Sequence, residues 1–165
     1  MSITPTRLAA EGEAWFLNQE LILNLMRFQC SATRSAYQAI HKDGLSGNDV
    51  KKRVKKDYMK SLNQRYVSDA YSMAKGIVQE KVIFGGKRNW KKLVNGSMSK
   101  QKWVSRRNNR LYSRGDRSHD GNPNIRIKGD KILVNNPSQR GKWIEGKVFI
   151  PEKFKPDWSC YDVKI

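Results

Sequence analysis

Residues 84–92 are Phe84-Gly85-Gly86-Lys87-Arg88-Asn89-Trp90-Lys91-Lys92, and the basic stretch that begins here extends to Lys128. From Lys87 to Lys128 the chain carries 13 Lys and Arg residues and only 2 acids, Asp116 and Asp120, so +11 of the net charge of +18 lies in about a quarter of its length. Charge of one sign at this density repels itself unless an anionic partner neutralises it, whereas an ordinary solvated surface intersperses both signs. The stretch therefore predicts binding to nucleic acid.

Aromatic residues lie among these cations, namely Trp90, Trp103 and Tyr112. Flat rings next to arginines can stack on unpaired bases while the cations follow the phosphates. For each tryptophan taken alone, burial in a core is the better interpretation, because large aromatic side chains are mostly buried in folded proteins. Stacking and core packing both stay open for Trp90 and Trp103.

Composition narrows the class of protein. A chain of 165 residues forms one domain, or one domain with a lobe, and can bury a core. Cys30 and Cys160 lie far apart without CxxC or Cys/His spacing, which indicates a reducing compartment and no zinc site in this chain. No run of roughly 18 apolar residues occurs, and residues 1–15 lack an apolar signal region. We therefore expect a cytoplasmic, nucleoid-associated protein without a membrane partner.

Helical spacing of apolar residues dominates the first part of the chain. It predicts a long helix over residues 13–43, a second helix that follows Ser46, and a third over residues 63–82. The lysines of the second helix are either a solvated face or a set of phosphate contacts, because no acid four residues further along the helix balances any of them. These lysines are Lys51, Lys52, Lys55 and Lys56.

Two shorter basic helices are predicted next, over residues 89–94 and 99–114. At helical spacing, the second would place one tryptophan and four arginines on adjacent faces as an arginine ridge. Its members are Trp103, Arg106, Arg107, Arg110 and Arg114. Arginine suits contacts to a nucleic-acid backbone because its planar guanidinium meets phosphate oxygens in pairs and stacks on bases.

After Gly121-Asn122-Pro123 the period of the apolar residues changes from helical to two. Strands are predicted over residues 125–128, 131–135 and 142–150, with a hairpin turn at Gly129-Asp130, and a fourth strand begins at Tyr161. We therefore expect an α+β fold, with a helical lobe over residues 1–115 and a small antiparallel, barrel-like portion over residues 116–165. Because the chain ends inside an alternating run, we expect this barrel to be incomplete until a longer C-terminal segment or a second chain supplies a partner strand.

Catalytic side chains do not converge in this sequence. One loop that groups acids, Asp116-Arg117-Ser118-His119-Asp120, could hold a divalent ion, but the arginines around it and its flanking glycines favour a turn. His41 is interpreted as a cap at the end of the first helix, and Gly85-Gly86-Lys87 lacks the spacing of a phosphate-binding loop. We predict neither catalytic residues nor a metal site in this chain.

Five segments, in order, resemble the N-terminal half of TnpB proteins, the transposon-encoded RNA-guided nucleases related to type V CRISPR effectors. They are Leu62-Asn63-Gln64-Arg65-Tyr66, Val82-Ile83-Phe84-Gly85-Gly86-Lys87-Arg88, residues 103–110, Arg114-Gly115-Asp116, and Gly121-Asn122-Pro123-Asn124-Ile125-Arg126-Ile127. The similarity covers about residues 60–151, and residues 1–59 match only as helices. Ile3 to Leu8, interrupted by Pro5, are a poor match to the opening barrel strand of that family.

The resemblance implies a recognition lobe of helices inserted into a wedge-like β-barrel, which holds guide RNA, the guide–target heteroduplex and the short motif beside the target. It also implies that the nuclease centre, whose acids bind Mg²⁺, and a zinc ribbon lie beyond these 165 residues. We therefore expect a segment that binds RNA and DNA without cleaving them by itself. Two alternatives stay open: a structural RNA-binding assembly protein, and one half of a split nuclease whose partner chain supplies the acids.

We expect the nucleic acid to be contacted by cations that follow its backbone and by two tryptophans that stack on bases. The predicted contact residues are Lys51, Lys52, Lys55, Lys56, Lys87, Arg88, Trp90, Lys91, Lys92, Trp103, Arg106, Arg107, Arg110, Arg114, Arg117 and Arg126.

Overall fold

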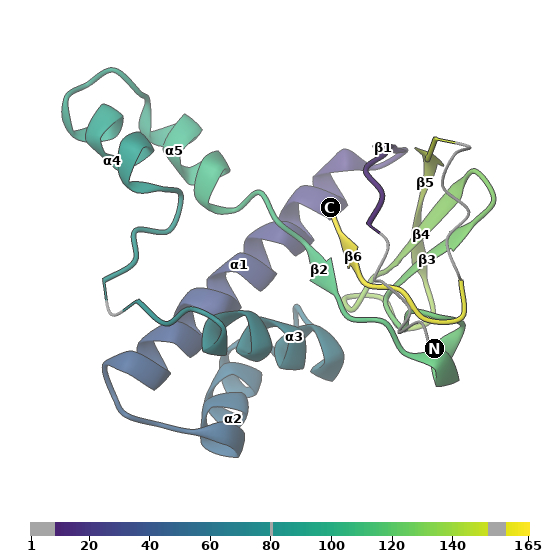
Figure 1. Cartoon of the computed structure of the whole chain (residues 1–165), viewed down its shortest axis with the longest axis horizontal. Helices are drawn as coiled ribbons and strands as arrows, with labels where there is room; N and C mark the ends of the chain where they lie inside the picture. Colours follow the sequence, from purple (N-terminus) through teal and green to yellow (C-terminus); the bar gives the residue numbers. More distant parts are fainter. Residues whose placement is uncertain (1–8, 80, 152–157) are drawn as a thin grey trace, which may run out of the picture.

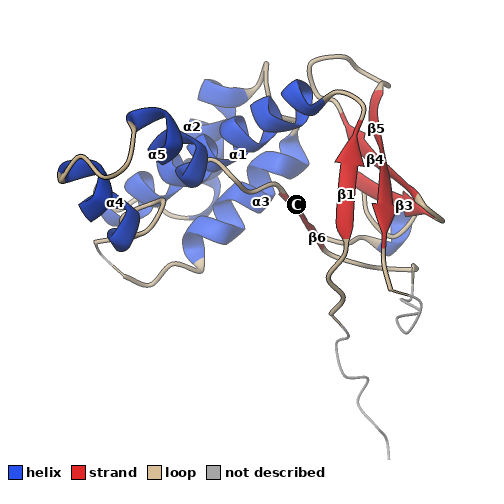
Figure 2. Cartoon of the chain, turned by 90° about the horizontal axis from the view of Figure 1, so that it is seen from above, coloured by secondary structure: helices blue, strands red, loops and turns tan. Residues whose placement is uncertain are grey.

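The computed structural model describes residues 9–79, 81–151 and 158–165, and it shows helices beside an antiparallel sheet (Figure 1, Figure 2). The predicted α+β fold, with its helical part first, is confirmed. The strand expected near Ile3 to Leu8 lies outside the described residues. In the part of the chain that is described, no helix is long and apolar enough to cross a membrane.

Three helices form the core of the helical part: α1 (Gln19–His41), α2 (Gly47–Tyr58) and α3 (Gln64–Lys75). Small side chains let α1 and α3 pack closely, because the alanines on their facing sides occupy little space. Fully buried are Ala32, Ala36 and Ala39 of α1, Ala70 and Ala74 of α3, and Val50 and Val54 of α2.

The predicted start of the first helix is wrong. Glu13–Phe16 forms strand β1, and α1 begins only after Asn18, whose side chain accepts a hydrogen bond from the Leu21 backbone N–H at 3.2 Å. Leu17, which the helical spacing of apolar residues would place on the buried face of a helix over residues 13–43, is 89% exposed. The capping side chain, and not the apolar spacing, therefore decides where the helix begins.

Two other predicted helices are too long. α3 ends at Lys75, before Gly76, and does not reach residue 82. α5 (Lys100–Arg107) ends because Asn108 folds back and donates from Nδ2 to the carbonyl of Val104 at 2.9 Å. Side-chain bonds of this kind compete with continuation of a helix. The predicted arginine ridge is therefore wrong as a helical face, since Arg110 and Arg114 lie beyond the end of α5.

The four-stranded sheet has the antiparallel order β1-β5-β4-β3, with β5 (Trp143–Phe149), β4 (Lys131–Asn135) and β3 (Ile125–Lys128) joined to β1. The predicted hairpin joins β3 to β4, and the described strands are not closed into a barrel. Since β1 precedes the helices, the sheet takes strands from both sides of the predicted boundary at residue 115.

The fourth predicted strand does not join this sheet. Instead β6 (Val163–Lys164) pairs with β2 (Tyr112–Ser113) in a separate antiparallel ribbon. The backbones of Leu111 and Ile165 extend the pairing by exchanging two hydrogen bonds, at 2.9 and 2.8 Å. Strand β6, for which we expected a partner from a longer C-terminal segment or a second chain, thus pairs with residues 112–113 of this chain.

The sheet has two different faces. Ile125, Ile132, Val134 and Ile144 point to an inner face and are buried in the same apolar core as the helices. Gly146 allows β1 to lie close to β5, because a Cβ there would come within 2.7 Å of the Phe16 ring. The alternation of buried and exposed side chains confirms the predicted period of two.

Candidate nucleic-acid interface

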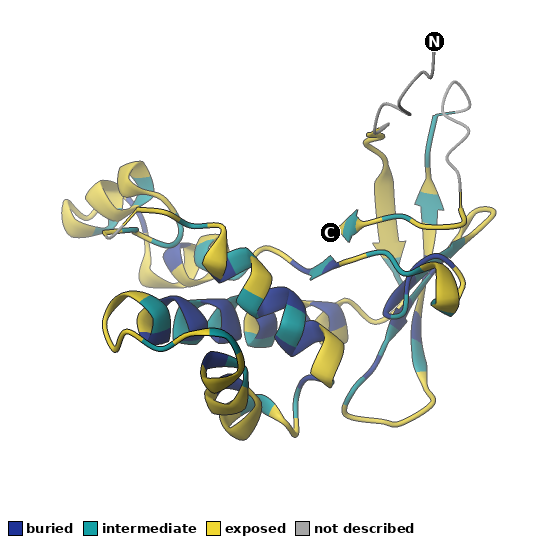
Figure 3. Ribbon diagram, turned by 60° about the horizontal axis from the view of Figure 1, so that its bottom comes forward, coloured by how far each residue is buried: buried dark blue, intermediate teal, exposed yellow. Residues whose placement is uncertain are grey.

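The helices α4 (Lys87–Val94) and α5 form a helical hairpin that lies apart from the other helices, with most of its surface exposed (Figure 1, Figure 3). It is built around Trp103, which is only 6% exposed. A Cβ at Gly85, where φ is 95°, would lie 2.9 Å from this indole, so only glycine lets the backbone pass over it. Trp90 packs on the same indole with ring centroids 5.5 Å apart but stays 42% exposed. Trp103 is therefore a buried core residue of the hairpin, whereas part of the Trp90 ring remains accessible.

The surface of this hairpin is cationic. The sequence has no acid between Glu80 and Asp116, and the ion pairs of the described residues include no cation of α4 or α5. On α4 the cations stand four residues apart, a like-charge spacing that destabilises a helix by roughly 0.2–0.5 kcal/mol per pair. An anionic ligand would relieve this repulsion. The exposed cations are Lys87, Arg88, Lys91, Lys92, Lys100, Lys102 and Arg106.

Arg34 of α1 anchors the hairpin to the helical core. Its guanidinium donates to the carbonyl of Arg107 at 3.0 Å and to the side-chain oxygen of Asn108 at 2.9 Å. Burial lowers the pKa of Arg34, and the charge of Arg107 lowers it further. Arg107 itself is half-buried, with its guanidinium 6.0 Å from the centroid of the Trp103 ring. Arg107 thus contributes to the packing of the hairpin as well as to its charge.

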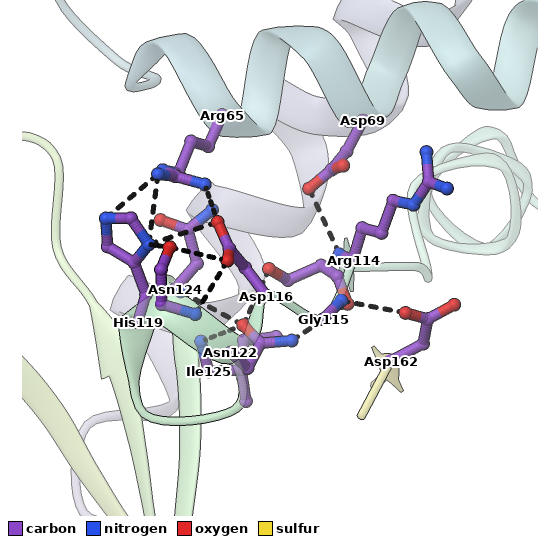
Figure 4. Close-up of polar contacts among 12 residues, drawn as sticks. Arg65, Asp69, Arg114, Gly115, Asp116, His119, Asn122, Asn124, Ile125 and Asp162 are labelled. Carbon is purple, nitrogen blue, oxygen red and sulfur yellow. Dashed lines mark hydrogen bonds and ion pairs between the residues drawn. The ribbon is translucent and has the colours of Figure 1, made fainter. Parts of the chain in front are cut away.

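Residues 113–125, here called the joint, link the helices to the sheet (Figure 4). Arg117–His119 forms a short 3-10 helix, η1, and Asp116 before it accepts hydrogen bonds from the backbone N–H and the hydroxyl of Ser118, at 2.9 and 2.7 Å. Arg65 of α3 adds an ion pair to Asp116 at 2.9 Å. The Ser118 hydrogen bonds, and after them Arg65, hold the pKa of Asp116 well below its usual range. The predicted turn is confirmed, and among the described residues no three His, Cys, Asp or Glu side chains gather as a metal ion requires.

Asn122 is the polar centre of the joint and is fully buried. Its Oδ1 accepts hydrogen bonds from the Ser113 hydroxyl at 2.8 Å and from the backbone N–H groups of Asn124 and Ile125 at 3.0 and 2.8 Å. Its Nδ2 donates to the carbonyls of Ser113 and Tyr161, both at 3.0 Å. The segment Gly121–Ile127, which is part of the resemblance to TnpB, therefore holds strands and C-terminal segment together here.

Asp69 of α3 is buried beside the joint, and its Oδ2 accepts a hydrogen bond from the Arg114 backbone N–H at 3.3 Å (Figure 4). Burial raises the pKa of Asp69 to about 6, and the nearby Asp162 carboxylate raises it as well. Asp162 accepts hydrogen bonds from the Gly115 N–H at 2.7 Å and from the Tyr112 hydroxyl at 2.9 Å. The carboxylates of Asp69 and Asp162 thus attach α3 and the C-terminal segment to the adjacent backbone N–H groups of Arg114 and Gly115.

The structure distributes the predicted contact residues over three places, which Figure 1 shows apart from one another. The first is the hairpin, the second is α2, and the third is the joint with the strands next to it. The hairpin carries Lys87, Arg88, Trp90, Lys91, Lys92, Trp103, Arg106 and Arg107; α2 carries Lys51, Lys52, Lys55 and Lys56; and the third place has Arg110, Arg114, Arg117 and Arg126.

Three of the four predicted lysines of α2 lie at a groove of about 210 Å³ between α2 and α3. Lys51, Lys52 and Lys55 line it together with Gln64 and Val67. Lys52 makes an ion pair of 4.0 Å with an acid one helical turn away, and both side chains are exposed. Such exposed pairs contribute little to stability, so this helix face keeps lysines that a phosphate could bind.

Arg126 contacts both an acid and an aromatic ring. It pairs with Asp120 at 2.9 Å, and its guanidinium lies 4.8 Å from the centroid of the Trp143 ring. Its neighbourhood, the outer face of the sheet, is the candidate surface that the sequence prediction missed. Placing residue 13 in a helix concealed the alternation Glu13-Ala14-Trp15-Phe16, which is the signal that could have revealed an exposed tryptophan on a strand.

Residues 8–161 match the family described as the SSO2105 N-terminal domain. The chain belongs to this family. Because the match runs from before β1 to beyond the joint and β5, the SSO2105 N-terminal domain comprises both the helices and the sheet. No curated protein and no solved structure matches the chain.

Proposed function

We propose that this SSO2105 N-terminal domain is the nucleic-acid-binding recognition segment of an RNA-guided DNA endonuclease related to TnpB and type V effectors, and that it supplies binding rather than cleavage. The observation that carries the proposal is the α4–α5 hairpin. Its exposed side chains include seven cations, and residues 81–115 contain no acid that could neutralise them.

The chemistry of the hairpin suits contacts to a phosphate backbone. Each Lys or Arg that neutralises a phosphate releases condensed counterions, which drives binding without reading the sequence of the bases. A guided protein needs this kind of contact, because base pairing with the guide reads the sequence and the protein holds the heteroduplex by its backbone. Trp90 lies next to these cations and offers an accessible ring to an unpaired base.

The resemblance of residues 60–151 to TnpB supports the guided form of this proposal. Its Phe84-Gly85-Gly86-Lys87 segment is the entrance to the hairpin, and its Gly121-Asn122 segment lies in the joint. The partners would be a guide RNA and its DNA target. Mg²⁺ and zinc would belong to a nuclease part of the same effector, on this polypeptide or on a second one.

The test measures binding by fluorescence anisotropy at several salt concentrations, with a structured RNA, a DNA duplex and an RNA–DNA heteroduplex. Replacing three exposed hairpin cations by alanine should weaken binding and reduce the salt slope on DNA by about 0.9 per lost phosphate contact. The variant is Lys91→Ala, Lys92→Ala and Arg106→Ala. The matched control removes the same charge at exposed positions outside the three places, as Lys42→Ala, Lys60→Ala and Lys75→Ala.

Each outcome separates the hypotheses. If the salt slope is the same for the hairpin variant and the wild type, the hairpin is not part of the interface. If the wild-type chain binds none of the three ligands at low salt, the proposal is contradicted. Tight binding to particular folded RNAs, without any preference for a heteroduplex, would favour a structural assembly protein. Nicking of DNA that requires Mg²⁺ and a second chain would favour a split nuclease.

A further inference from the structure

The outer face of the sheet is the face turned away from the helices. Strand register places four side chains in one row across it, with Trp15 opposite Lys147, Lys147 opposite Lys131, and Lys131 opposite Lys128. Residues directly opposite each other in antiparallel strands lie on the same face, and neighbouring strands are about 4.8 Å apart. One aromatic ring and three lysines therefore cross the sheet in line.

Two more aromatic rings lie on this face, because side chains two residues apart along a strand point the same way. Phe149 stands two residues from Lys147 and is 59% exposed, while Trp15 is 53% exposed. Trp143, at the other end of β5, is half-buried beneath the guanidinium of Arg126. The apolar core lies on the opposite face, so none of these rings contributes to it.

The lysine row costs stability in the free protein, because like charges directly opposite each other in a sheet repel. The ion pairs within the described ranges involve neither Lys128, nor Lys131, nor Lys147. The acids of the same face, Glu13 and Glu145, stand in the neighbouring rows. A ligand that brings negative charge along the row would remove this repulsion.

We propose that the outer face of the sheet binds single-stranded nucleic acid, with bases stacked on Trp15 and Phe149 and phosphates along the row of Lys147, Lys131 and Lys128. This inference rests on the proposed function, because it assigns a second contact to the same class of ligand. Unpaired bases offer flat faces to exposed rings, whereas a duplex keeps those faces stacked inside. An apolar protein partner would bury three lysines without counter-charges, which is unfavourable.

The experiment compares labelled oligo-dT and oligo-U of about 15 nucleotides, a length near the upper site size of sheet-based binding modules, with a blunt DNA duplex of equal length. Trp15→Ala combined with Phe149→Ala should weaken binding of the single strands by about 5- to 100-fold and leave duplex binding within about twofold. Trp15→Phe keeps a ring and should retain most of the affinity. Met59→Ala, which removes an exposed apolar side chain at the end of α2, is the matched control.

The charge of the face is tested separately. Lys131→Ala combined with Lys147→Ala should reduce the salt slope for the single strands by about 0.7 per lost contact. Thermal unfolding midpoints verify that each variant folds, and small changes are expected because the replaced side chains are exposed.

The outcomes distinguish this inference from the proposed function. If single-strand affinity survives Trp15→Ala with Phe149→Ala while the hairpin variant still loses duplex binding, the sheet is not the binding surface and the proposed function stands. If the wild-type chain binds neither single strands nor duplex, both proposals fall. A protein partner that binds the wild-type face and is lost with Trp15→Ala would also overturn the inference.

Discussion

At the scale of the residue, two buried polar side chains hold the chain between the helices and the sheet in place. Gln29 of α1 is fully buried, and it donates to the carbonyl of Tyr112 at 2.8 Å and accepts from its N–H at 2.7 Å. Its amide thus binds both backbone groups of Tyr112, as a neighbouring β-strand would. Asn122 makes five hydrogen bonds, four within the joint and one to Tyr161. A buried polar group that loses its partner costs more than the bond had contributed, so these positions tolerate little change.

Asp69 gives the fold a pH dependence of unusual sign for a carboxylate. Its pKa is raised from 3.8 to about 6, so between these values the folded state binds the proton more tightly than the unfolded state. The contribution of Asp69 to stability is therefore greatest below pH about 4 and is lost as the pH rises to about 6. Asp69→Asn keeps an oxygen that can accept from the Arg114 N–H, and it should abolish this decline. Urea unfolding of both proteins at several pH values between about 4 and 7 measures the difference.

Asp116 does not interfere with that measurement. Its pKa is lowered, so its contribution is present above the unfolded pKa and is lost as the pH falls below about 5, a change that wild type and Asp69→Asn share and that cancels in their difference. Asp130→Asn, in the exposed turn between β3 and β4, is the control, and its stability should depend on pH as that of the wild type does. Identical profiles for wild type and Asp69→Asn between pH about 4 and 6 would exclude Asp69 as the cause.

At the scale of the element, the packing of the α4–α5 hairpin can be tested by comparing alanine substitutions at two of its glycines, Gly85 and Gly96. Gly85 and Gly96 both have positive φ, at 95° and 80°, so alanine strains the backbone at either position by about 1–2 kcal/mol. A Cβ at Gly85 would also approach the Trp103 ring to 2.9 Å, whereas a Cβ at Gly96 meets no atom within 4 Å. Gly85→Ala should therefore loosen the hairpin more than Gly96→Ala does. Hydrogen exchange of the α4 and α5 amides checks this, and equal protection in the two variants would contradict the packing role of Gly85.

The elements differ in how well the sequence predicts them. The hairpin Gly129-Asp130 and the strands beside it were predictable because turn residues and alternation act locally. The end of α5 was not, because besides the local bond from Asn108 to Val104 it involves Arg34, a residue distant in sequence that binds the Arg107 carbonyl and the Asn108 side chain. The pairing of β6 with β2 was likewise hidden, because nothing in the alternation of residues 161–165 specifies which edge they join.

The sequence predicts which cations are available to the candidate site, but not how the fold distributes them in space. The uncompensated cations of the hairpin follow directly from the sequence, since no acid lies between Glu80 and Asp116. Their distribution over three places required the structure, because helix ends separate Arg110 and Arg114 from Arg106. The row of three lysines and Trp15 across the sheet requires strand register, which brings Trp15 next to residues from the C-terminal part of the chain.

At the scale of the whole molecule, the two proposed surfaces lie at opposite ends, with α1 between them (Figure 1). The hairpin offers cations suited to a duplex backbone, and the sheet offers rings and cations suited to an unpaired strand. A nucleic acid that contains both a duplex and a single-stranded tail could contact both surfaces at once. A guided effector meets such a ligand, because opening the target releases one strand beside a heteroduplex.

A duplex with a single-stranded overhang should therefore bind roughly 10²- to 10⁴-fold more tightly than the blunt duplex or the free strand, because the second contact forms at a high effective concentration. Trp15→Ala with Phe149→Ala should reduce its affinity to that of the blunt duplex, and the hairpin variant should reduce it to that of the free strand. Competition anisotropy with overhangs of increasing length measures the gain, which should appear only once the overhang can span the two surfaces. If both surfaces bind their separate ligands but no overhang increases the affinity, the surfaces do not act on one nucleic acid, and the arrangement of hairpin and sheet serves two different ligands.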